Sequence, residues 1–173
     1  SPHIKSRFLS ELEAIRLSGA STERALIVAL YLQSVGEPVQ EHVLSELIGQ
    51  DAVSLFERAK SSGTFISYRP RTKSFDVLPS INAREALKQF FLPKTVTDTI
   101  VDTVRNMEGV RFQGSFRRIF TEFMRYTQLK QVVSDFDQQD RFFDRLSEIW
   151  FCNNQVLFKL QWSMAMRDHQ DWG

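Results

Sequence analysis

The chain has 173 residues, of which 42% are hydrophobic and 25% charged, and its formal net charge is +1. This composition excludes an intrinsically disordered chain, and the length fits one ordinary domain or two small ones. The near-zero charge gives no general electrostatic case for nucleic-acid binding, which usually comes with a clear basic excess.

The number of cysteines and the length of the apolar runs indicate the compartment and exclude a membrane partner. The single cysteine, Cys152, cannot form an intrachain disulfide, which fits a reducing compartment such as the cytoplasm. No apolar run approaches the ~18 to 20 residues that a membrane span requires, so no membrane partner is expected. We therefore expect a cytoplasmic protein with a substantial core, rich in phenylalanine. Cys152 and the aromatic side chains of residues 112–162 are expected to lie in this core.

Residues 1–92 are predicted to form a winged-helix domain with a preceding helix. Apolar residues at helical spacing predict four helices before the first strand, with Ser21 or Thr22 as the cap of the second. In chain order, these helices are Phe8–Leu17, Thr22–Val35, Val39–Ile48 and Ala52–Lys60.

A β-hairpin follows these helices. Two runs with alternating apolar residues, Phe65–Tyr68 and Ser74–Leu78, are separated by turn-forming residues that include Pro70. The last three helices followed by a hairpin have the order of a winged helix. The loop carries three cations, Arg69, Arg71 and Lys73, which are the candidate contacts of this wing with a partner or a nucleic acid.

Residues 93–173 are predicted to form a helical linker or the start of a helical repeat domain. Pro93 disfavours a helical conformation at Leu92, so the boundary is placed there. Ser80 is expected to cap the last helix before this boundary. The predicted helices on either side of the boundary are Ile81–Phe91, Val96–Met107, Phe116–Val133, Arg141–Cys152 and Gln155–Asp168. The fold class is therefore mainly α, a winged helix-turn-helix followed by an α-helical array.

No motif for catalysis, a cofactor or a metal is recognised. The sequence lacks the glycine patterns that bind nucleotide phosphates, and its three histidines, His3, His42 and His169, are scattered. The acidic run from Asp135 to Asp144 lacks the glycine and the closing glutamate of a calcium loop, so we expect it to cap helices. We predict that this segment is not an enzyme and binds no cofactor or metal of its own.

One alternative is a stand-alone winged-helix transcription regulator whose helical half dimerises. Arg69, Arg71 and Lys73 would then contact phosphates, and Asp51–Lys60 would be the recognition helix. That helix exposes Glu57 beside its cations and has no Asn or Gln within it to read bases. A wing that is solvated or contacts protein is therefore favoured over one that binds DNA.

Two stretches resemble a known protein group. The sequence LFERAKSSGTFI (55–66), the hairpin and PSINAREAL (79–87) together resemble the winged helix that follows the nucleotide-binding core of bacterial STAND-type P-loop ATPases. The segment 154–171 is similar to the first helix of the tetratricopeptide-like or other helical arrays that such proteins carry next.

This resemblance implies a cytoplasmic, ATP-dependent oligomerising switch, often in antiviral defence, whose winged helix moves when a trigger binds. The group often has a histidine that reaches the nucleotide at the start of the helix after the wing, whereas this chain reads Leu78-Pro-Ser-Ile-Asn82. We therefore expect a non-catalytic relay module, with ATP and Mg²⁺ bound elsewhere in the full-length protein. Its expected partners are other domains or copies of the same protein and a protein trigger.

Overall fold

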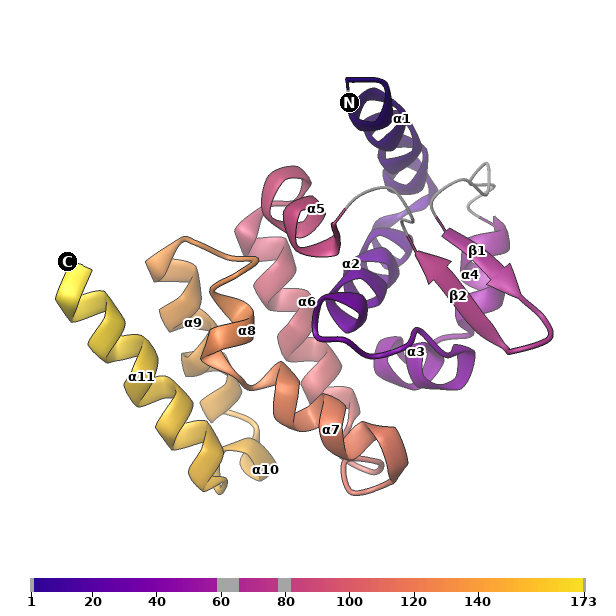
Figure 1. Ribbon diagram of the computed structural model, residues 1–173. Coiled ribbons are helices and arrows are strands. Elements are labelled where there is room, and N and C mark those ends of the chain that lie inside the picture. The colour runs from indigo at the N-terminus through magenta and orange to yellow at the C-terminus, as the bar shows by residue number, and fades with distance from the viewer. Residues whose placement is uncertain (1, 59–65, 78–81, 173) are drawn as a thin grey trace. The chain divides into compact units, whose positions relative to one another are not determined.

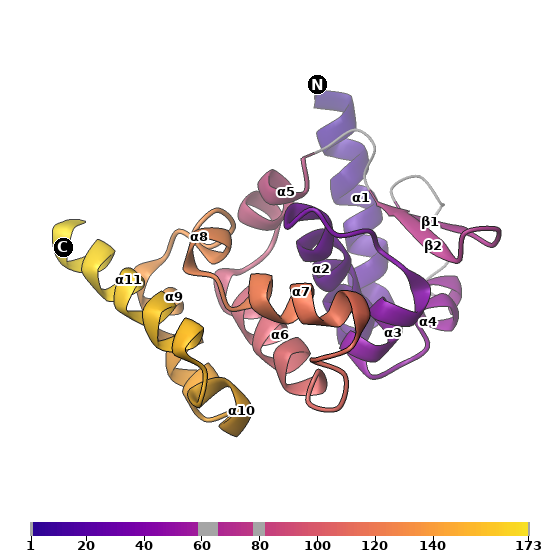
Figure 2. The same ribbon diagram turned by 60° about the horizontal axis from the view of Figure 1, so that its bottom comes forward.

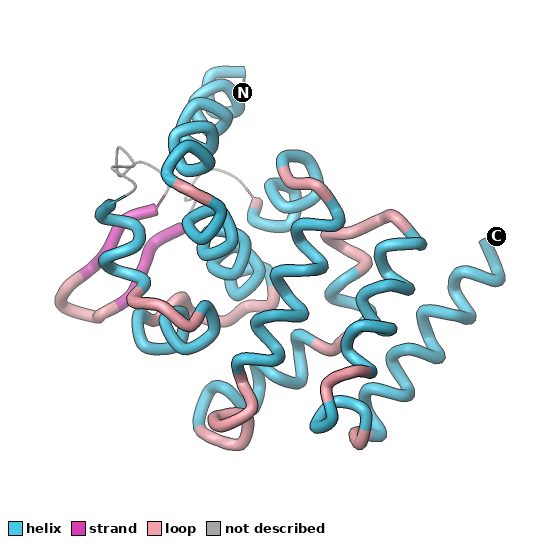
Figure 3. The backbone as a smooth tube through the Cα atoms, turned by 180° about the vertical axis from the view of Figure 1, so that it is seen from behind, coloured by secondary structure: helices cyan, strands magenta, loops and turns pink. Residues whose placement is uncertain are grey.

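The computed structural model describes residues 2–58, 66–77 and 82–172 (Figure 1). The described residues form a mainly helical protein with one two-stranded antiparallel sheet, which confirms the predicted class at this level. Helices account for most of the backbone in Figure 3. Internal contacts divide the chain into two compact units, Ser1–Phe90 and Phe91–Gly173.

The first unit contains a two-stranded hairpin and, among its described residues, five helices. In chain order its elements are α1 (Pro2–Ser18), α2 (Ala20–Ser34), α3 (Glu41–Ile48), α4 (Ala52–Arg58), β1 (Ile66–Arg69), β2 (Ser74–Val77) and α5 (Ala83–Phe90).

Helix α2 is the centre of this unit. Each of its residues from Ala25 to Leu32 is at most 2% exposed. The helix contacts α1, α3, α4, α5 and β2 (Figures 1 and 2). A helical segment that is apolar on all sides must be surrounded by other elements, and residues 25–32 of α2 have this composition. The first unit is therefore built around a helix whose central eight residues are enclosed.

The junction between α1 and α2 differs from the prediction. The cap of α2 is Gly19, with φ 128° and ψ 163°, and neither Ser21 nor Thr22 caps the helix. Because α2 already begins at Ala20, both hydroxyl residues lie inside its first turn, where Thr22 is buried. Glycine at the junction permits this backbone conformation, which other residues rarely adopt.

The hairpin is tied to the segment before α3. Its strands pair antiparallel, with Ile66 opposite Val77 and Arg69 opposite Ser74. The N–H of Phe75 donates to the carbonyl of Val39 at 2.8 Å, and Gln40 forms a β-bridge with Ser74. The third predicted helix therefore begins at Glu41 and not at Val39, because the residue before Glu41 is extended. Predictions for Phe65, Leu78 and the Ser80 cap lie outside the described residues.

The second unit consists, as far as residue 172, of six helices joined by short connections. In chain order they are α6 (Pro93–Asn106), α7 (Gly114–Phe123), α8 (Tyr126–Leu129), α9 (Phe136–Ser147), α10 (Trp150–Asn153) and α11 (Val156–Trp172). Helix α6 has proline in its first turn, and the residue before it, Leu92, is extended, as the sequence predicts.

Two helices predicted as continuous are interrupted. The predicted helix Phe116–Val133 ends at Phe123, because Arg125 is extended. The predicted helix Arg141–Cys152 breaks at Ile149, which is also extended. These breaks divide the predicted four-helix array into six helices.

The second break changes which side chains are buried. Ile149, Phe151 and Cys152 are 5%, 3% and 0% exposed, respectively. In one continuous helix, turning about 100° per residue, Trp150 would continue the buried stripe of Phe142 and Leu146, and Phe151 would lie on the opposite side. The break lets Ile149, Phe151 and Cys152 enter the core and leaves Trp150, which was predicted to be buried, 59% exposed.

The acidic residue Asp135 caps α9, as predicted for the acidic run. Its carboxylate accepts a hydrogen bond from the N–H of Gln138 at 3.1 Å. Within the described ranges, none of the helices combines the length and the apolar character needed to cross a bilayer.

Candidate functional site

The three cations of the predicted wing do not have the same environment. Arg69 ends β1 and forms an ion pair with Asp76 on β2. Arg71 and Lys73 lie in the turn and are exposed. Lys73 has a left-handed backbone, with φ 51°, and its carbonyl accepts the N–H of Glu41 at 2.9 Å. One of the three cations is thus partly neutralised on the hairpin itself.

A side-chain contact also fastens the hairpin to α3. The hydroxyl of Tyr68 donates to Glu41 at 2.5 Å. This hydrogen bond to a carboxylate, together with burial, raises the pKa of Tyr68 above its ordinary value. The turn end of the hairpin is therefore held by side-chain and backbone bonds to the start of α3 and the residues just before it.

The exposed side of α4 carries both signs of charge. Ser54, Glu57 and Arg58 are exposed, as predicted. Asp51, just before the helix, accepts from the N–H of Ser54 at 3.3 Å, and the Arg58 guanidinium donates to the Ser54 carbonyl at 3.3 Å. An acidic residue on this face opposes a phosphate backbone.

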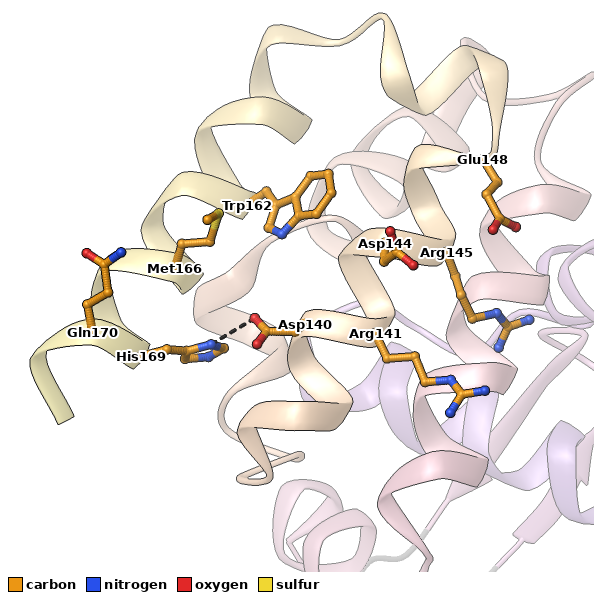
Figure 4. Close-up of a pocket in the computed structure, with 9 residues that line it drawn as sticks. All are labelled: Asp140, Arg141, Asp144, Arg145, Glu148, Trp162, Met166, His169 and Gln170. Atoms are coloured by element: carbon orange, nitrogen blue, oxygen red, sulfur yellow. Dashed lines mark ion pairs between the residues drawn. The ribbon is translucent and has the colours of Figure 1, made fainter. Parts of the chain in front are cut away.

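A groove of about 920 Å³ lies between α9 and α11 (Figure 4). Its α9 side carries three acidic residues spaced by one helical turn, Asp140, Asp144 and Glu148. Its α11 side carries Trp162, Met166 and His169. Arg141 and Arg145 also line the groove, which thus combines an apolar surface with a row of carboxylates and two arginines.

His169 closes one end of this groove. Its Nδ1 lies 2.8 Å from an oxygen of Asp140, and its Nε2 lies 2.6 Å from the side-chain oxygen of Gln139. The imidazole also stacks on Phe136, with 4.3 Å between ring centroids. The scattered histidines gave no sign of this contact in the sequence, because it joins two helices that are separated in the chain.

A second cluster surrounds Arg111. Its guanidinium lies 4.5 Å from the ring centroid of Phe112, 5.2 Å from that of Trp150 and 4.8 Å from that of Phe151. The indole N–H of Trp150 donates to Glu108 at 2.9 Å. Phe112 and Trp150 are 69% and 59% exposed. The prediction that the aromatic residues form core is confirmed for most of them and wrong for these two and for Phe136, which is 36% exposed.

Cys152 is fully buried, which confirms the prediction of a small core residue. Burial raises the pKa of its thiol to about 12, against the opposing effect of Arg111 and Arg105. A thiol in this environment is protonated at neutral pH and is a poor nucleophile.

The described residues contain no group of three or more His, Cys, Asp or Glu side chains that could hold a metal ion. No protein-family model, curated protein or solved structure matches the chain. The functional argument therefore depends on the surfaces described above.

Proposed function

We propose that the chain is the non-catalytic winged-helix and helical relay module of a STAND-like ATPase. In this role it transmits the binding of a trigger to oligomerisation through protein–protein contacts. ATP and Mg²⁺ would bind elsewhere in the full-length protein. A role in antiviral defence is part of the proposal and rests on the sequence resemblance alone.

The arrangement of the first unit supports the winged-helix part of the proposal. Helices α3 and α4 are joined by three residues, Gly49 to Asp51, of which Gly49 has a left-handed backbone. A short turn that contains glycine is typical of a helix-turn-helix. The β-bridge between Gln40 and Ser74 adds a third extended segment to the hairpin, beside its second strand. The order α2, bridge, α3, α4, β1, β2 is the one expected of a winged helix.

The observation that carries the protein-contact part is the exposed apolar surface of the second unit. Six large apolar side chains of this unit are at least half exposed. They are Leu92 (71%), Phe112 (69%), Trp150 (59%), Val156 (82%), Leu160 (55%) and Met166 (50%). Phe112 and Trp150 both contact Arg111, and Val156 and Leu160 lie one turn apart on α11. Exposed apolar side chains that adjoin one another mark protein contacts more often than nucleic-acid contacts.

The alternative is DNA binding through the wing, and it is favoured by one observation. Arg71 and Lys73 are both exposed in the turn of the hairpin, the position from which a wing contacts phosphates. Against it stand the ion pair of Arg69 with Asp76 and the acidic Glu57 on α4. We therefore place protein contact first.

Two experiments test the proposal. The first is to read the gene upstream of Ser1, where we expect a P-loop ATPase in the same reading frame. Its absence from the complete gene would refute the STAND assignment.

The second is fluorescence anisotropy of labelled duplex DNA with the purified chain at about 50 mM salt, where electrostatic binding is strong. We expect no binding. Salt-sensitive binding that is lost in the triple variant R69A/R71A/K73A would establish the alternative. The matched triple variant R117A/R118A/R141A, which removes three exposed arginines of the second unit, serves as the control.

A further inference from the structure

We propose that the groove between α9 and α11 binds a basic amphipathic helix of another polypeptide. This inference goes beyond the proposed function and does not depend on the ATPase assignment. It concerns the second unit alone and follows from the chemistry of the groove.

The first step is the spacing of the carboxylates. Asp140, Asp144 and Glu148, the residue that follows α9, are spaced at intervals of four residues, so they lie along one face of the helix and its C-terminal end for about 12 Å. Lysine or arginine side chains at the same interval on a partner helix would face them in turn. The periodicity of the acidic row therefore fits a helix better than an extended peptide or a small ligand.

The second step is the charge that remains available. Among the described residues, Asp144 and Glu148 form no ion pair, and both side chains are exposed. Asp140 is in contact with His169. Arg145, which also lines the groove, is held by Asp98 and Asp102 of α6. Figure 4 shows Arg141 and Arg145 extending away from α11. Arg141 also lines the groove, so its lining carries both signs of charge, and Asp144 and Glu148 are the carboxylates that remain available to a basic partner.

The third step is the apolar surface opposite this row. Trp162 is partly exposed, and Met166 is half exposed, one turn further along α11. Phe158, which is buried, supports the indole at 5.7 Å between ring centroids. A rigid aromatic group and a flexible thioether together form an adaptable contact for leucine-like side chains. Helices that bind in grooves use this combination of an apolar stripe and a charged edge.

The test uses the full chain and a fluorescein-labelled peptide of about 18 residues, or five helical turns, made of Leu and Lys at amphipathic spacing. We expect the peptide to bind, and a peptide with Glu in place of Lys to bind at least about tenfold more weakly. Binding should also weaken as salt rises, because the carboxylates are exposed.

The decisive variant is the charge reversal D144K/E148K, for which we expect at least an approximately tenfold loss of affinity. The matched control is E46K/E57K, which changes the net charge equally at two exposed residues of the first unit and should bind like the wild type. Equal affinity of D144K/E148K and the wild type, or equal binding of the Glu peptide, would overturn the proposal.

Circular dichroism establishes whether D144K/E148K is folded. If it is not, the neutral variant D144N/E148Q replaces it, and unchanged affinity in that variant would likewise overturn the proposal. Sedimentation equilibrium of the chain alone tests whether a second copy of the chain occupies the groove instead. Self-association that D144N/E148Q abolishes would assign the groove to a second copy of the chain and would also overturn the proposal.

Discussion

The backbone N–H of Tyr126 donates a buried hydrogen bond to the side-chain oxygen of Gln161, at 2.8 Å. Tyr126 begins α8, just after the break at Arg125, and Gln161 lies in the middle of α11, where it is 4% exposed. The N–H groups of a first helical turn have no partner within the helix. Gln161 supplies this partner from another helix and so stabilises the interruption between α7 and α8.

Replacing Gln161 by Leu should therefore destabilise the second unit. The change leaves the N–H of Tyr126 buried without its acceptor, and we expect a loss of about 1–3 kcal/mol in the free energy of unfolding. Urea denaturation measures this loss, and hydrogen exchange should show faster exchange of the Tyr126 amide. The control is Gln170→Leu, at an exposed position of the same helix, for which we expect a change within about 0.5 kcal/mol.

Replacing Lys73 by Gly should stabilise the hairpin although it removes a surface cation. Lys73 has φ 51°, a conformation that costs a residue with a Cβ about 1 kcal/mol. Glycine avoids this cost but loses more entropy on folding, so we expect a net gain of about 0.5 kcal/mol. Thermal denaturation of Lys73→Gly and Lys73→Ala makes the comparison. A Gly variant no more stable than the Ala variant would contradict the prediction.

Replacing Asp135 by Ala should destabilise α9, because the helix then loses its capping side chain. Loss of an N-cap typically costs about 1 kcal/mol. Asp135→Asn retains an acceptor for the N–H of Gln138 and should recover most of that loss. Chemical denaturation of both variants measures the difference, and equal destabilisation would show that the charge matters and the cap does not.

The stability of the chain should depend on Cys152 at alkaline pH. The thiol ionises near 9.0 when exposed and near 12 in the folded protein. Between these values the unfolded chain has lost the proton that the folded chain retains, so rising pH favours unfolding. The contribution of the protonated thiol to the free energy of unfolding is fully present below pH 9. Above pH 9 it falls by at most about 1.4 kcal/mol per pH unit.

Cys152→Ala removes this dependence. We expect the wild-type stability to fall more steeply than that of the variant between about pH 9 and 11, measured by chemical denaturation. The slopes are compared and not the absolute values, because the smaller side chain also leaves a cavity. Identical slopes would show that the thiol does not retain its proton in the folded protein at these pH values.

Local patterns were sufficient for most of the helices and for the hairpin. Apolar spacing predicted α2, and proline predicted the extended Leu92 before α6. The carboxylate of Asp135 acts as a cap, as expected from an acidic residue before an apolar helix. Each of these features is determined by residues within a few positions along the chain.

Features that depend on distant residues were not predicted. The break at Arg125 is stabilised by Gln161, and the apolar sequence around it is compatible with a continuous helix. The groove was not predicted because the sequence pattern places a break before Arg141, whereas α9 begins at Phe136 and includes Asp140. With the helix extended, the four-residue interval of Asp140, Asp144 and Glu148 would have indicated a common face.

The enclosure of α2 has a consequence for the variation that this chain can tolerate. An amphipathic helix accepts exchanges on the side that faces water, so its permissive positions recur with each turn. Between Ala25 and Leu32 no such side exists, since every position meets a neighbouring element. A deep mutational scan should find eight successive intolerant sites there, and a periodic profile along α11.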